Sequence, residues 1–153
     1  LRVAAEDAKL GFVFNRRGMI ADADLLWLLP RMIGFNAAMD LLLTGLTIRG
    51  REALELGLVH RVVPAGQVLD HAMDLARDIA ANTAPASAAI TKRLLHAFLT
   101  EGRDTAEVRQ TRAFLWAATR PDAVEGVVSF LERRAPAWTV SKQVDLAEIS
   151  DPA

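Results

Sequence analysis

Asp22 is the residue whose type and setting in the sequence most favour chemistry. It precedes an apolar segment that contains Leu25 and Trp27, and the apolar Phe14 lies shortly before it. A carboxylate on a loop beside apolar side chains can move protons or act as a nucleophile. Aspartate is also a common residue at helix N-termini, where its carboxylate accepts backbone N–H bonds. A structural role as a helix cap therefore stays open for Asp22, and the same role is the stronger interpretation for Asp24.

Two pairs of arginines could bind phosphate or carboxylate groups. Arg16 and Arg17 lie in a loop, and Arg133 and Arg134 lie at the end of an apolar-striped helix. A guanidinium group binds such anions through paired hydrogen bonds. The alternative for Arg16 and Arg17 is a solvated loop pair, and the alternative for Arg133 and Arg134 is a pair of cations that suit a helix C-terminus. No metal site is expected, because the spacing typical of metal ligands is missing among the three histidines, His60, His71 and His96.

Composition excludes several classes of protein. The 18 basic and 19 acidic residues give a net charge of −1, which argues against a nucleic-acid-binding protein. The sequence contains no cysteine, so disulfides, cysteine-bound zinc and thiol catalysis are excluded. No apolar run approaches the ~20 residues that a membrane span needs. We expect a cytoplasmic protein with no membrane span.

The elements that must position these side chains are mostly helices. The first 18 residues have short apolar runs typical of strands, and residues 58–63 are β-branched and strand-like. Helices are predicted over most of the rest, with a kink or break at Pro30 and an end of the last helix at Pro136. So few strands cannot form a stable sheet alone. With a first residue that is Leu1, this leads us to expect the later part of a longer chain.

Several segments, in this order, resemble the crotonase (enoyl-CoA hydratase/isomerase) superfamily. They cover most of the chain up to about Trp138, and they are Ala5–Phe12, Leu29–Gly34, Ala38–Gly45, Arg51–Val59, Pro85–Lys92 and Phe130–Arg134. The resemblance implies an α/β, crotonase-like fold of repeated ββα units whose N-terminal part is missing here. Residues 1–64 would end the ββα core, 65–138 would form a helical trimerisation region, and 139–153 would be a polar tail.

The resemblance also implies an acyl-CoA substrate and a homotrimer or a hexamer built as a dimer of trimers. No separate cofactor is implied, because CoA is part of the substrate. Family chemistry uses an oxyanion hole of two backbone N–H groups, which stabilises the thioester enolate. Both donors, and the first catalytic glutamate of true hydratases, belong to segments upstream of Leu1 in the family pattern.

The residues that match family positions point away from ordinary hydration. Phe14 stands where a hydratase carries its second catalytic glutamate, and phenylalanine cannot transfer a proton. Asp22 falls where aroyl-CoA dehalogenase-like members carry a catalytic carboxylate. The resemblance thus implies that Asp22 is catalytic, in isomerisation, hydrolysis or dehalogenation.

Four further residues are expected to bind the substrate. Phe14 would line the acyl pocket and Trp27 would border it, while Arg133 and Arg134 resemble the basic end of the last helix that contacts CoA. The alternative is a truncated or degenerate, non-catalytic paralogue that serves as an assembly or CoA-binding module.

Overall fold

The computed structural model describes residues 1–141. The chain divides into two units, and the boundary between them falls within helix α4. The first unit runs from Leu1 to Leu75, and the second begins at Ala76. The mostly helical fold with a few short strands agrees with the prediction. The predicted division into 1–64, 65–138 and 139–153 stays a prediction, and residues 142–153 of the polar tail lie outside the described residues.

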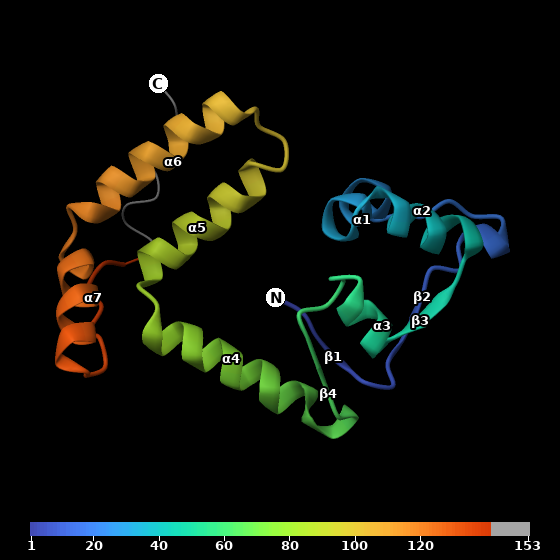
Figure 1. The fold of residues 1–153 in the computed structure, drawn as a ribbon, viewed down its shortest axis with the longest axis horizontal. Helices are drawn as coiled ribbons and strands as arrows, with labels where there is room; N and C mark the ends of the chain where they lie inside the picture. The colour runs from blue at the N-terminus through green and yellow to red at the C-terminus, as the bar shows by residue number, and fades with distance from the viewer. Residues whose placement is uncertain (142–153) are drawn as a thin grey trace. The chain divides into compact units, whose positions relative to one another are not determined.

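Four three-residue strands form two small sheets in the first unit (Figure 1). β1 (Val3–Ala5) pairs in parallel with β4 (Arg61–Val63), so that Ala4 lies opposite Val62. β2 (Lys9–Gly11) pairs antiparallel with β3 (Thr47–Arg49), with Leu10 opposite Ile48. The β1–β4 pair therefore joins the first strand of the first unit to its last, although they are far apart in sequence.

The helices of the first unit supply half of the buried residues in its core, and β3 and the connecting segments supply the rest. These helices are η1 (Asn15–Arg17), α1 (Leu25–Ile33), α2 (Phe35–Thr44), α3 (Gly50–Glu55) and η2 (Ala65–Gln67). Leu29 is fully buried, at the centre of a cluster that also contains Phe12, Ala38, Leu41, Ile48, Ala53, Leu58 and Val59.

Of the two outcomes predicted at Pro30, a kink or a break, the break does not occur. Helix α1 runs through Pro30 to Ile33 as a single element. Proline removes only one helical hydrogen bond here, while the neighbouring Leu29 is fully buried in the core. Packing of the apolar face therefore holds the helix together, as tertiary contacts do for most helices in proteins.

The second unit contains helices alone. α4 (Val68–Asn82) leads into it and is followed by α5 (Pro85–Ala97), α6 (Arg103–Ala118) and α7 (Pro121–Glu132). α5 and α6 lie side by side (Figure 1) and bury the small and β-branched side chains of Ala86, Ile90 and Ala113. Across residues 1–141, no helix has the length and apolar character needed to cross a membrane.

The last helix ends earlier than predicted. α7 stops at Glu132, and Arg133 takes a left-handed conformation that terminates it three residues before Pro136. The chain then reverses and runs back beside α7. We call residues 134–140 the C-terminal strap.

Candidate functional site

A tight turn presents Asp22 just before helix α1. The N–H of Leu25 donates to the carbonyl of Asp22 at 3.0 Å, and both intervening residues are left-handed, Ala23 with φ 50° and Asp24 with φ 59°. Positive φ at both central positions defines a type I′ turn, which normally uses glycine or asparagine. An alanine there is strained, because its Cβ crowds the backbone. The turn holds Asp22 outside the helix.

The Asp22 carboxylate has no structural task in the described part of the chain. Its side chain is exposed, and it neither accepts a hydrogen bond nor forms an ion pair within residues 1–141. The N-cap of α1 is Asp24, and that residue makes no side-chain capping bond either. The interpretation of Asp22 as a helix cap is therefore wrong, because the turn places it two residues before the N-cap.

Apolar side chains flank Asp22 on both sides along the chain. Met19 and Ile20 are 52% and 77% exposed, and Leu26 and Trp27 are 54% and 37% exposed. Such a concentration of exposed apolar side chains around one carboxylate is typical of a surface that another molecule or segment covers.

Trp27 and Phe14 are each fixed by local contacts. The guanidinium carbon of Arg31 lies 3.9 Å from the centre of the Trp27 ring, and Arg31 Nη1 donates to the Trp27 carbonyl at 2.8 Å. Phe14 is half-buried, and its carbonyl accepts the N–H groups of Arg17 and Met19. Phe14, Asp22 and Trp27 all belong to the first unit, where Asp22 lies on the segment between Phe14 and helix α1, which carries Trp27.

Arg16 has a structural role. Its Nε donates to the carbonyl of Thr44 at 2.6 Å, at the C-terminal end of α2. Its stem lies so close to Gly45 that a Cβ on that glycine would be 2.7 Å from Arg16 Cγ. Neither an anion site nor a solvated loop pair describes Arg16, because its guanidinium caps the C-terminal end of α2.

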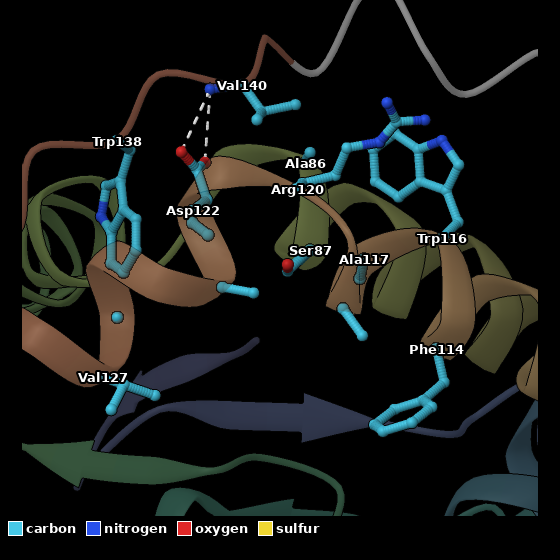
Figure 2. Close-up of a pocket in the computed structure, with 14 residues that line it drawn as sticks. Ala86, Ser87, Phe114, Trp116, Ala117, Arg120, Asp122, Val127, Trp138 and Val140 are labelled. Atoms are coloured by element: carbon cyan, nitrogen blue, oxygen red, sulfur yellow. Dashed lines mark hydrogen bonds between the residues drawn. The ribbon is translucent and has the colours of Figure 1, made fainter.

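A second cluster of polar groups anchors the C-terminal strap to α7. Asp122 is buried near the start of the helix, and its Oδ1 accepts hydrogen bonds from Thr139 N at 2.8 Å and Thr139 Oγ1 at 3.0 Å. The N–H of Val140 lies 3.3 Å from each carboxylate oxygen (Figure 2). The first residues of the predicted polar tail are thus held in place by a buried carboxylate.

Glu125, one turn later on α7, holds the start of the strap. Arg134 Nη1 and Nη2 donate to Glu125 Oε1 and Oε2 at 2.5 and 2.8 Å, and Ala137 N donates to Oε1 at 2.7 Å. Arg134 Nε also donates to Glu132 Oε2 at 2.6 Å. The hydrogen bonds to Glu125, first those from Arg134 and then that from Ala137 N, lower the pKa of Glu125 from 4.5 to about 2. The two carboxylates in turn raise the pKa of Arg134 above its ordinary value.

Between the strap and the helices of the second unit lies an apolar pocket of about 370 Å³ (Figure 2). Its walls include Phe114, Trp116, Val127, Trp138 and Val140, with small residues between them. Arg120 stacks 4.4 Å from the centre of the Trp116 ring. No three acidic or histidine side chains of residues 1–141 come close enough together to hold a metal ion.

Comparison with known proteins now identifies the fold. The family model for enoyl-CoA hydratase/isomerase matches residues 1–141. The chain belongs to the enoyl-CoA hydratase/isomerase family. An enoyl-CoA hydratase of Alternaria alternata is 37% identical over 137 residues, which cover 89% of this chain and 46% of that protein. The 1,2-epoxyphenylacetyl-CoA isomerase of Escherichia coli is 33% identical over 138 residues, covering 90% and 52%.

Solved structures agree with the family. The crystal structure of an enoyl-CoA hydratase from Bacillus anthracis superposes with a TM-score of 0.83 and 32% identity, over 90% of this chain and 53% of that one. The chain therefore spans about half the length of the relatives that it matches.

Among the residues proposed for this family member, the structure groups some and separates others. Phe14, Asp22 and Trp27 share the first unit, whereas Arg133 and Arg134 lie in the second. Within residues 1–141 Arg133 makes no side-chain bond, while Arg134 is bound on both edges. Sequence reasoning missed the strap and its pocket. The available signal was the spacing of Asp122 and Glu125, which places two acids on one face of α7.

Proposed function

We propose that the whole protein is an acyl-CoA enzyme in which the Asp22 carboxylate acts on the acyl group. The observation that carries this proposal is an exposed carboxylate that a strained turn presents and that no other described residue uses. The thioester enolate would be stabilised by an oxyanion hole upstream of Leu1, where preorganised N–H donors contribute ~3–4 kcal/mol each. Family membership supports an acyl-CoA substrate.

Among the reaction classes named for this family, isomerisation needs only one carboxylate, which takes a proton and returns it. Asp22 would take a proton from the carbon next to the thioester carbonyl, and the electron pair would move onto the thioester oxygen. The protonated Asp22 would then return the proton to a different carbon, so that substrate and product are isomers. Hydration by two glutamates needs an acid at position 14, where this chain has phenylalanine. The isomerase named among the relatives supports the same class.

Four of the residues named from the sequence would contact the acyl-CoA substrate or lie next to it. Phe14 and Trp27 would form walls of the acyl pocket, because both flank the Asp22 loop with apolar rings. Arg133 would contact a phosphate of CoA directly, since its guanidinium has no partner in the described chain. Arg134 would belong to the same basic end of α7, although its donors face two carboxylates.

Assembly into a trimer or hexamer accounts for the apolar surface of the second unit. Phe114, Val124, Val127, Phe130 and Leu131 are each at least 60% exposed on α6 and α7. Large exposed apolar side chains that gather on neighbouring helices are typical of a surface that another protein chain covers. Sedimentation of the full-length protein at micromolar concentration tests this assembly, and a stable monomer would contradict it.

The test of the catalytic proposal replaces Asp22 with asparagine in the full-length protein. Asp22→Asn keeps the size of the side chain and removes its ability to transfer a proton, so kcat should fall by about 10²-fold or more. Asp24→Asn is the matched control, since it removes the same charge two residues away. The thermal midpoints of both variants should stay near that of the native protein.

The assay follows isomerisation of a panel of straight-chain and aryl enoyl-CoA thioesters. Equal kcat values for Asp22→Asn and the native protein would show that Asp22 is not a catalytic residue. If the native protein turns over none of these thioesters, the non-catalytic alternative becomes the better interpretation.

A further inference from the structure

Arg133 occupies a position where protein chains usually place glycine. It follows the last residue of α7 with φ 54° and ψ 40°, and its N–H closes the helix by donating to the carbonyl of Phe130. Glycine predominates at this left-handed position because it has no Cβ to crowd the backbone. Backbone strain that a chain retains at one residue is a reason to look for function there.

The residues on either side of Arg133 are tied together across it. Arg134 Nε donates to Glu132 Oε2 at 2.6 Å, so the two neighbours of Arg133 bridge the turn. The other edge of the Arg134 guanidinium bonds to both oxygens of Glu125. Because α7 carries Glu125, this contact fixes the turn to the body of the helix.

The same bonds decide which arginine can meet a ligand. The Arg134 guanidinium donates hydrogen bonds to Glu125, to Glu132 and to the carbonyl of Ala135. Without Arg134, two carboxylates close to the turn would compete for Arg133. With it, both acids are engaged and the guanidinium of Arg133 has no partner within residues 1–141.

We propose that Glu125 and Glu132 are positioning residues that act through Arg134 to direct the guanidinium of Arg133 toward a phosphate group of CoA. This inference rests on the proposed function, in which Arg133 contacts CoA. An arginine on a turn that is held in place loses less conformational freedom on binding than one on a mobile turn, and the affinity is correspondingly higher.

The experiment measures the dissociation constant of CoA by calorimetry for the full-length protein and its variants. Arg133→Gly removes the charge and suits the left-handed backbone, so its thermal midpoint should be unchanged or higher. Its affinity for CoA should fall about tenfold, the weight of one charge-assisted contact. Arg133→Lys, which keeps the charge, should recover part of that loss.

The positioning role is tested by a double-mutant cycle. Glu132→Gln should weaken CoA binding about threefold in the native background and should have no further effect in the Arg133→Gly background. Glu132 is the acid to replace because it is exposed, so its loss does not threaten folding. Glu107→Gln, an exposed acid on α6, is the matched control and should leave the affinity unchanged.

The possible failures are distinguishable. If the native protein does not bind CoA, the proposed function and this inference are both wrong. If it binds but Arg133→Gly binds equally well, Arg133 is not the phosphate contact. If Arg133→Gly weakens binding while Glu132→Gln has no effect, or has the same effect in both backgrounds, the positioning role alone is overturned.

Discussion

Gly50 is the position where the smallest substitution should damage the first unit most. It is buried at the start of α3, directly after β3. A Cβ at this position would lie 2.0 Å from the carbonyl oxygen of Ala5 and 3.2 Å from that of Glu6. Both obstacles are backbone atoms, so no change of side-chain rotamer can make room. Gly50→Ala must therefore push β1 away from α3.

The size of the effect follows from two opposing terms. Alanine favours a helix over glycine by about 1 kcal/mol. Overpacking a well-filled site costs ~1–3 kcal/mol and more where backbone must move. A carbon 2.0 Å from an oxygen lies far inside contact distance, so the upper part of that range applies, and displacement of Ala5 also threatens its pairing with Val63. We expect Gly50→Ala to lower the free energy of unfolding by about 2 kcal/mol or more.

Urea denaturation followed by circular dichroism measures this loss. Gly126→Ala is the matched control, because its Cβ would meet the Trp138 ring at 3.6 Å, an ordinary contact, within helix α7. Its expected effect has the opposite sign, a gain of ~0.5–1 kcal/mol from helix propensity. Equal stability of Gly50→Ala and the native protein would refute the argument from close approach.

Three other substitutions test the packing, the turn and the strap. Leu29→Ala should cost ~2–5 kcal/mol in urea denaturation, because the side chain is fully buried, and a loss under 1 kcal/mol would contradict its central place in the core. Ala23→Gly should raise the free energy of unfolding by ~0.5–1 kcal/mol by relieving the left-handed strain, whereas an unchanged value would show that the turn is not strained. Glu125 has a pKa lowered to about 2, so its contribution to stability is complete above pH 4.5 and declines as the pH falls toward 2. The difference in urea midpoint between the native protein and Glu125→Gln should therefore be smaller at pH 3 than at pH 6, and a constant difference would contradict the ion pair with Arg134.

The sequence predicts the elements of this chain better than their ends. Apolar spacing locates the helices of the second unit, and a proline marks the first turn of α5 and of α7, because both signals are local. The end of α7 could not be located in this way, because Arg133 closes the helix against the preference for glycine. Pro30 alone left open whether α1 continues or breaks, since the outcome depends on the burial of Leu29 among residues distant in sequence.

Some residues of the candidate site could be selected from local sequence signals, and others could not. Asp22, Phe14 and Trp27 could be selected from their types and their match to family positions. Local rules favoured a helix cap at Asp22, and only the left-handed turn in the structure removes that role. The strap on Asp122 was missed because its partners lie 17 and 18 residues away. A pairing over that distance leaves no periodic pattern in the sequence.

The places where the chain departs from local backbone rules coincide with the residues proposed to act on the substrate. Among residues 1–141, the non-glycine residues with positive φ are Ala23, Asp24 and Arg133. The first two build the turn that presents Asp22, and the third carries the unpartnered guanidinium. At each of them glycine would be the less strained choice. Sequences that fold well agree with local preference almost everywhere, and exceptions concentrate at functional sites. Backbone strain thus supports roles for Asp22 and Arg133 on grounds independent of the family resemblance.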